Sequence, residues 1–280
     1  MTTARTVAAG LLRFVWLELQ SLYFAAVIFA AIAVTAVVPL PIARYDALLV
    51  IGVVLTLALW WTGWESGREV AVITAFHALG VTMEIFKVAA GSWAYPEDAL
   101  TKVAGVPLYA GFMYAAVGSY IVQAWRRFDL RVTGYRPVPL TVLAIAAYLN
   151  FFTHHWIPDL RWLIAAAFVW FMRRTVIHFT VGPHRLRMPL ALSFVAIGFA
   201  LWIAENLATF LGAWQYPNQR EFWEAVHVGK FGSWSLLVSL SFVLVATVKQ
   251  FEGTLYGHPD DNPSVLPWPR SALPQREAEA

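Results

Sequence analysis

The chain has no cysteine among its 280 residues, and charged residues are scarce. The absence of cysteine excludes disulfides, thiolate nucleophiles and cysteine-ligated metal sites. Only 13% of the residues are charged, against about a quarter in an average soluble domain. No basic stretch lies on a soluble face, so the small net charge of +3 does not indicate a nucleic-acid partner.

Hydrophobic residues make up 59% of the chain and occur in long runs. Runs such as residues 22–38 do not alternate in polarity, which argues against a β-barrel. At roughly 20 residues a span, the sequence predicts an all-α, polytopic membrane protein with about eight transmembrane helices. The predicted spans are residues 17–39, 48–64, 70–91, 103–125, 138–152, 156–172, 188–212 and 228–248.

Arginines in two loops predict the orientation in a bacterial inner membrane, since cytoplasmic loops are enriched in Lys and Arg. They follow the fourth and sixth spans: Arg126, Arg127, Arg131 and Arg136, then Arg173, Arg174, Arg185 and Arg187. We expect both termini to be cytoplasmic. Residues 1–16 would form an interfacial segment, 17–250 one membrane domain with halves of about 17–125 and 138–250, and 251–280 a disordered tail.

A thirteen-residue pattern occurs twice, as "EIFKVAAGSWAYP" (84–96) and "ENLATFLGAWQYP" (205–217). The matching residues are 121 positions apart: Glu84 and Glu205, Gly91 and Gly212, Trp93 and Trp214, Tyr95 and Tyr216, Pro96 and Pro217. This spacing predicts two degenerate parallel repeats of four helices each. The two glutamates would then face each other at one depth, in the outer half of the bilayer.

A glutamate at membrane depth is a functional candidate by default, because burying its charge is expensive. The structural alternative for Glu84 is an ion pair with Lys87, three residues along the helix. The position corresponding to Lys87 in the second copy is Ala208, so an ion pair explains only one glutamate. The tryptophans and tyrosines of the pattern have an ordinary reading as anchors at the membrane interface.

Other polar residues gather on the same side of the predicted bundle. The stretch "NFFTHHWIPDLRW" (150–162) and the entry to the last span hold most of them, and the opposite side shows only arginines and loop histidines. Adjacent histidines cannot both point into one pocket, and we favour His155 over His154. His155, His227 and a carboxylate could hold Zn²⁺ or Fe²⁺.

Two chemistries are open for the glutamates. One is the metal-dependent chemistry just described. The other is metal-free acid–base catalysis, in which a protonated glutamate acts as general acid and its ionised partner, beside Lys87, stabilises a cationic intermediate. We predict an enzyme acting on a lipid or isoprenoid, with Glu84 and Glu205 as catalytic residues. Its substrate-binding residues would be Lys87, Trp93, Trp214, Asn206 and Lys230. The alternatives are a proton-coupled transporter, a metal-dependent hydrolase using His155 and His227, and a scaffold without catalysis.

Several motifs carry a family resemblance. Through "HALGVTMEIFKVAAGSWAYPE", "NFFTHHWIPDLRW" and "AENLATFLGAWQYPNQ", the chain resembles the YoaT-like family of bacterial integral-membrane proteins of unknown function, between residues 13 and 251. The Glu-to-Gly-to-Trp-x-Tyr element is also similar to motifs of small membrane carotenoid cyclases, although their Pro-Glu-Glu element is absent here. That similarity implies a lipid or isoprenoid substrate, that is, a lipophilic small molecule. The lipid bilayer is a partner expected from the hydrophobic runs.

Overall fold

The computed structural model describes residues 2–251 and residue 255, and the chain forms nine α-helices within them. The helices are α1 Thr2–Ser21, α2 Tyr23–Val37, α3 Arg44–Trp61, α4 Gly67–Ala89, α5 Gly111–Arg127, α6 Pro137–Thr153, α7 Arg161–Met172, α8 Leu190–Phe210 and α9 Gly229–Phe251. The predicted helical fold is confirmed. Nearly all of the tail predicted at 251–280 lies outside the described residues.

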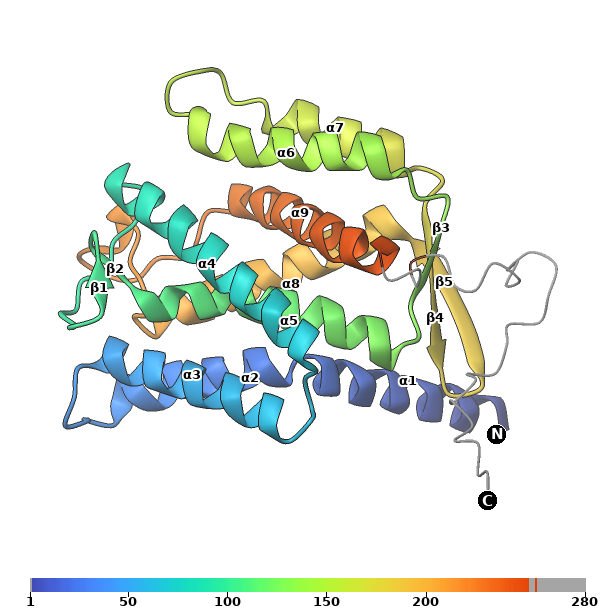
Figure 1. The fold of residues 1–280 in the computed structure, drawn as a ribbon, viewed down its shortest axis with the longest axis horizontal. Helices are drawn as coiled ribbons and strands as arrows, with labels where there is room; N and C mark the ends of the chain where they lie inside the picture. The colour runs from blue at the N-terminus through green and yellow to red at the C-terminus, as the bar shows by residue number, and fades with distance from the viewer. Residues whose placement is uncertain (1, 252–254, 256–280) are drawn as a thin grey trace.

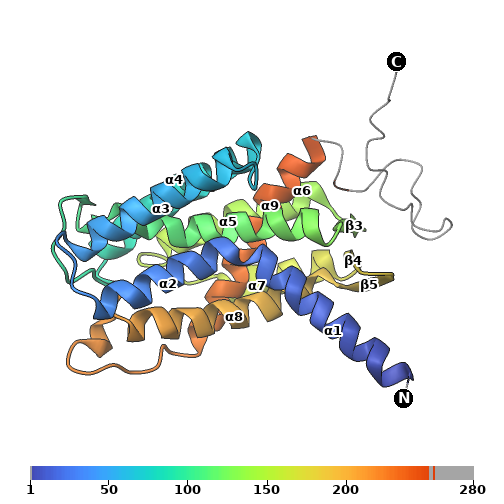
Figure 2. The same ribbon diagram turned by 90° about the horizontal axis from the view of Figure 1, so that it is seen from below.

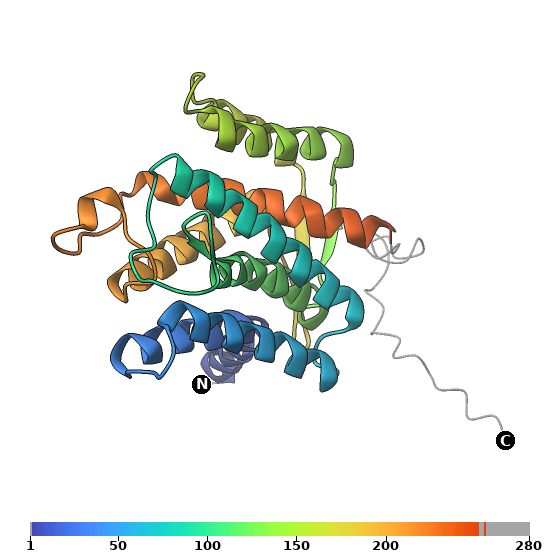
Figure 3. The ribbon, with the colours of Figure 1, turned by 60° about the vertical axis from the view of Figure 1, so that its left-hand side comes forward.

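The helices are arranged in three tiers (Figure 1). Helices α1, α2 and α3 lie together along one side, α4, α5, α8 and α9 form the middle, and the α6–α7 hairpin lies along the other side. Figure 3 shows the same three tiers from another direction. The site described below lies in the middle tier and against the α6–α7 hairpin.

Helix α5 is the central helix, and most of its residues are buried. Small residues let α4 approach it closely: a Cβ at Gly111 would lie 2.6 Å from the carbonyl oxygen of His77, and one at Gly118 would lie 2.7 Å from the Phe76 ring. Both distances are shorter than a carbon contact allows. The α4–α5 hairpin therefore depends on glycine at these two positions.

Four helices are long and apolar enough to cross a membrane: α3, α4, α8 and α9. A fifth span is possible if α1 and α2 count as one, but they meet at an angle of 67° after a break at residue 22, which Figure 2 shows clearly. Helices lie at all eight predicted positions. Helices α6 and α7 are apolar but shorter than 18 residues, and α5 is a short, buried helix ending in Arg126 and Arg127. Eight transmembrane helices are thus not confirmed.

The predicted fourth span begins too early. Residues Lys102–Val103 and Val106–Pro107 form a small antiparallel hairpin, β1–β2, followed by the 3₁₀ helix η1 (Leu108–Ala110). Its two turn residues, Ala104 and Gly105, both have positive φ, which is the backbone that a two-residue hairpin turn requires. A second 3₁₀ helix, η2 (Pro217–Gln219), follows the second Trp-x-Tyr-Pro corner.

The two arginine-rich loops are not loops alone. Strands β3 (Arg131–Thr133), β4 (Val176–Val181) and β5 (His184–Pro189) form an antiparallel sheet in that order, next to α1 (Figure 1). Alternate residues of β4 are buried, as expected for a strand with one face on a core. The sheet brings both loops to one end of the molecule. The alternation in "VIHFTV" was a signal that sequence analysis missed.

Candidate functional site

The helices that carry the two glutamates end in the same way. After α4 and after α8, a glycine with φ +71° follows the last turn: Gly91 and Gly212. The next amide in each copy, of Ser92 or Ala213, donates to a carbonyl five residues back, at 2.9 and 3.0 Å. This is the Schellman end that glycine favours, so the local sequence determines where both helices stop.

The two Trp-x-Tyr-Pro corners pair with each other. The backbone N–H of Ala94 donates to the carbonyl of Gln215 at 2.9 Å, and the backbone N–H of Gln215 donates to the carbonyl of Ala94 at 3.0 Å. The paired residues occupy equivalent positions, so the corners are related by a local two-fold. This likeness covers the helix ends and corners, and it does not establish a repeat of four whole helices.

Glu84 is 3% exposed and accepts three hydrogen bonds. The Trp93 indole (2.6 Å) and the Tyr95 hydroxyl (2.8 Å) donate to Oε2, and the Tyr114 hydroxyl donates to Oε1 at 2.7 Å. The ion pair with Lys87, which was the structural alternative for Glu84, is not formed. An indole N–H can only donate, so this set suits an ionised carboxylate, with three neutral donors in the place of Lys87.

Glu205 is also buried and accepts two hydrogen bonds. The Tyr216 hydroxyl donates to Oε1 at 2.5 Å, and the indole of Trp234 on α9 donates to Oε2 at 2.7 Å. Tyr216 thus matches Tyr95, but Trp234 takes the part that the repeat would give to Trp214. Trp214 is packed in the hydrophobic core instead, where it interacts with the Tyr216 phenol and not with Glu205.

The corner aromatics are therefore not the exposed interface anchors of their ordinary reading. Burial, followed by the charge of Glu84, raises the pKa of the Tyr95 phenol well above its usual value. Burial and the charge of Glu205 do the same to the pKa of Tyr216. Both phenols stay protonated and keep donating.

Lys230 lies between the two carboxylate groups. Its Nζ is 5.0 Å from the centroid of the Trp93 ring and 4.7 Å from that of Tyr216, and these two rings contact each other edge to face at 5.9 Å. Cation–π attraction holds the ammonium over both rings. Because Trp93 donates to Glu84 and Tyr216 to Glu205, one lysine connects the two glutamates.

Lys87 points to the loop after α6. Its Nζ lies 3.2 Å from Nε2 of His155, 3.5 Å from Nε2 of His154 and 4.1 Å from the centre of the Phe151 ring. Burial, then the charges of Lys87 and His154, lowers the pKa of His155. A neutral imidazole has one ring nitrogen that can accept a hydrogen bond from an N–H of the ammonium.

A cavity of about 240 Å³ lies among α4–α9. It is lined by Met83, Lys87, Ser92, Trp93, Tyr114, Ala147, Tyr148, Asn150, Phe151, His154, Arg161, Ile164, Glu205, Tyr216, Lys230, Ser233, Trp234, Leu236, Leu237 and Leu240. The lining includes Glu205 but not Glu84, and His154 rather than His155, which we had favoured. Tyr114 and Trp234 were missed because nothing in their local sequence marks them.

The other predicted site residues lie elsewhere. Asn206 is structural: its amide donates to the carbonyl of Trp202 and accepts from the amide of Val226. His227 is exposed and accepts from the amide of Gly229 at the start of α9. Within residues 2–251 and 255, no group of three or more His, Asp or Glu side chains could hold a metal ion. The predicted two-histidine, one-carboxylate set is therefore not assembled there.

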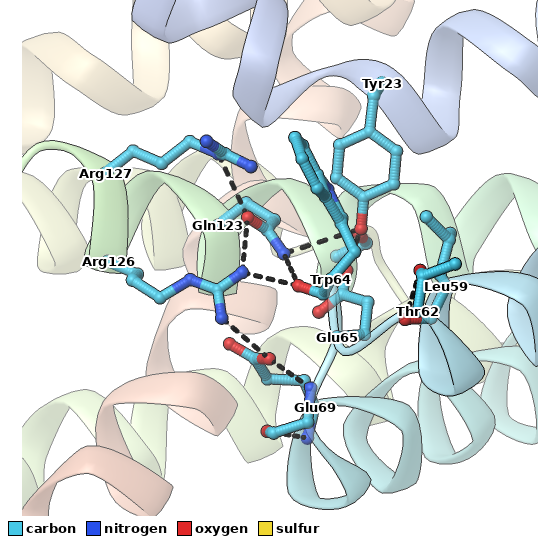
Figure 4. Close-up of polar contacts among 11 residues, drawn as sticks. Tyr23, Leu59, Thr62, Trp64, Glu65, Glu69, Gln123, Arg126 and Arg127 are labelled. Atoms are coloured by element: carbon cyan, nitrogen blue, oxygen red, sulfur yellow. Dashed lines mark hydrogen bonds and ion pairs between the residues drawn. The ribbon is translucent and has the colours of Figure 1, made fainter.

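A third buried carboxylate lies at the opposite end of α4, contrary to our expectation (Figure 4). Glu65, between α3 and α4, is 1% exposed. Its Oε1 accepts from the hydroxyls of Tyr23 and Ser119, and its Oε2 has no hydrogen-bond partner among the described residues. Burial raises the pKa of Glu65. No spacing in the sequence distinguishes it from a loop glutamate.

A layer of polar residues covers Glu65 (Figure 4). The amide of Gln123 donates to Tyr23 and its oxygen accepts from Arg126 (3.0 Å) and Arg127 (3.1 Å). Arg126 also donates to the carbonyl of Trp64 at 2.6 Å. The arginines read as orientation signals are therefore also part of a packed network at the end of α5.

Fold and site together define a helical protein, compatible with a membrane, in which two buried glutamates flank a lysine beside a cavity. The chain belongs to the family described as "Protein of unknown function (DUF817)", whose family model matches residues 10–242. It is 50% identical over 242 residues to "Uncharacterized protein YoaT" of Bacillus subtilis (strain 168), covering 86% of this chain and 92% of that protein. No solved structure matches the chain.

These matches confirm the YoaT-like family that the motifs indicated. They give no support to the similarity to membrane carotenoid cyclases. Neither the family description nor the name of the relative states an activity.

Proposed function

We propose that this protein is a membrane-embedded enzyme that transfers a proton on a lipid or isoprenoid substrate. The observation that carries the proposal is the position of Glu205. It is a buried carboxylate on the wall of a cavity, with Lys230 nearby and apolar residues around it. A carboxylate in such a site can exchange a proton with a bound molecule.

The two glutamates have unequal roles in this proposal. Glu205 accepts one hydrogen bond on each oxygen, which leaves lone pairs free to take a proton from the substrate. It then returns the proton at another atom, so the net isomerisation balances without a second reactant. Lys230 stabilises the negative charge that forms on the substrate. Glu84 acts as a positioning residue, because it holds the cavity-lining Trp93.

The membrane arrangement is part of the proposal. We place the protein in the bacterial inner membrane with both termini cytoplasmic and with two parallel halves of four helices. The sheet that holds both arginine-rich loops at one end of the molecule supports the proposed orientation. The pairing of the two Trp-x-Tyr-Pro corners at equivalent positions supports the division into two related halves.

A proton-coupled transporter is the second candidate, and the observation that favours it is Glu65 (Figure 4). Its network reaches Gln123, about 13 Å further along α5 than Tyr114, the partner of Glu84. Buried carboxylate groups thus lie toward both ends of α4 and α5. Proton-driven uptake by sealed proteoliposomes would select this function over the enzyme.

The enzyme is tested by deuterium incorporation. Protein in liposomes made from bacterial lipid extract is incubated in D₂O, and the lipids are then analysed by mass spectrometry after exchange back into H₂O. We expect wild type and the matched control Glu224→Gln, in an exposed loop, to label one lipid class at carbon. Glu205→Gln should not. Labelling by a folded Glu205→Gln protein at the wild-type rate would refute the role of Glu205.

A further inference from the structure

The cavity contains two lysines that form no ion pair with a carboxylate of the described residues. Lys87 is 4% exposed, and its polar contacts there are with His154 and His155. Lys230 is half-buried and contacts two aromatic rings, and the charges of Glu205 and Glu84 act on it from a greater distance. Within residues 2–251 and 255, no carboxylate lies within ion-pair distance of either ammonium group. A buried charge without such a partner is costly, and a bound anion would remove this cost.

A third cation lies at the same end of the cavity. Arg161 pairs with Asp159 at 2.5 Å and donates to the Ser233 hydroxyl at 3.0 Å. The charges that act most on Lys87 are the repulsive ones of Lys230 and Arg161 and the attractive one of Asp159. Neither glutamate of the site is among them. The Lys87 end of the cavity is therefore positive, while the charge of Glu205 acts on Lys230.

The rest of the lining is apolar. Side chains from α6, α7 and α9 form this wall: Ala147, Phe151, Ile164, Leu236, Leu237 and Leu240. A cationic end joined to an apolar wall matches a molecule with an anionic head and a hydrocarbon chain.

We propose that the cavity binds an anionic lipid, with its phosphate or carboxylate head at Lys87 and Lys230 and its chain along α6, α7 and α9. The head lies toward Lys87, because the charge of Glu205 acts on Lys230 and would repel an anion that lay closer to that lysine. This inference rests on the proposed function only in identifying that lipid with the substrate. Binding itself can be measured without turnover.

The test is calorimetric titration of the full-length protein in nanodiscs of neutral phosphatidylcholine. The probes are dodecyl phosphate, dodecanoate, dodecanol and inorganic phosphate. We expect the two anionic amphiphiles to bind and dodecanol to bind at least about 10-fold more weakly, because it cannot make charge-assisted hydrogen bonds. Inorganic phosphate should bind weakly because it lacks a chain. If dodecanol binds as tightly as dodecyl phosphate, the claim that the head group must be anionic is wrong. If inorganic phosphate binds as tightly as dodecyl phosphate, the claim that the ligand is a lipid is wrong.

Variants locate the head group. Lys87→Met should weaken dodecyl phosphate binding by about 10- to 100-fold, the value of a charge-assisted contact, and Lys87→Arg should restore most of it. Lys249→Met, near the far end of α9, is the matched control and should bind as wild type does. Unchanged binding by Lys87→Met overturns the proposal.

The inference and the proposed function fail separately. Glu205→Gln should bind dodecyl phosphate at least as tightly as wild type, because it removes a repelling charge from the cavity wall, and it should lose deuterium incorporation. Binding without Glu205-dependent labelling would refute the enzyme alone. Deuterium labelling without selective binding of the anionic amphiphiles would refute the proposed binding of an anionic lipid and leave the proposed enzyme standing.

Discussion

Tyr95 and Tyr216 allow a sharp comparison, because each donates one hydrogen bond to a buried glutamate from an equivalent position. Replacement by phenylalanine removes the hydroxyl and keeps the ring. In Tyr95→Phe, Glu84 loses one of three donors, and neither Glu84 nor Tyr95 lines the cavity. In Tyr216→Phe, Glu205 loses one of two donors on the cavity wall.

The expected magnitudes follow from that difference. A hydrogen bond to a charged group contributes about 1.5–3 kcal/mol, and nothing can replace the one lost at Glu84. We therefore expect Tyr95→Phe to lower the free energy of unfolding by about 1.5–3 kcal/mol. Water can enter the cavity and donate to Glu205 instead, so Tyr216→Phe should cost about 1 kcal/mol or less.

The assay is reversible unfolding in mixed micelles, titrated with a denaturing detergent and followed by tryptophan fluorescence. A third variant, Glu84→Gln, completes a double-mutant cycle with Tyr95→Phe. In that neutral background the hydroxyl should contribute only about 0.5–1.5 kcal/mol. A loss for Tyr216→Phe equal to or larger than that for Tyr95→Phe would refute the reasoning, as would a cycle without coupling.

Two further predictions concern the surroundings of the site. Arg44 donates to the carbonyls of Leu211 and Gly212, directly after α8, and pairs with Glu97. Arg44→Met should lower the free energy of unfolding by about 2–4 kcal/mol in the same assay. Arg44→Lys should cost less, and an equal loss would contradict the role of these guanidinium hydrogen bonds. Burial raises the pKa of Asp159, but hydrogen bonds from Asn150 and Arg161 outweigh it and hold the pKa below its usual value. Its stabilisation is thus present above about pH 4 and is lost as the pH falls through the lowered pKa. The difference in unfolding free energy from Asp159→Asn should shrink below that pH, and a pH-independent difference would contradict this assignment.

Local sequence was sufficient to predict where the helices lie and where the two glutamate-bearing helices, α4 and α8, end. Hydrophobic runs located a helix at all eight predicted positions, because a run of apolar residues has the same preference wherever it packs. The doubled pattern identified Gly91 and Gly212 as helix ends and Glu84 and Glu205 as buried. Hydrophobic runs did not distinguish a helix long enough to cross a membrane from a shorter one, so α5, α6 and α7 were also read as spans.

The partners of the glutamates could not be predicted in the same way. The sequence offered Lys87 as the partner of Glu84, since the two are three residues apart on one helix. In the structure Glu84 faces α5 and Lys87 faces the loop after α6. Which face of α4 meets which neighbour is decided by the glycine contacts of α4 with α5, and no local pattern records that choice.

The sequence by itself thus determined a helical protein with two glutamates buried at equivalent helix ends. It could do so because apolar runs and glycine helix ends act through neighbours a few residues away. The tertiary structure alone decided that Glu205 lines the cavity and that Lys230 lies between the carboxylates. It also buried Glu65. These features depend on contacts between helices distant in the chain, and such contacts form only when the whole bundle packs.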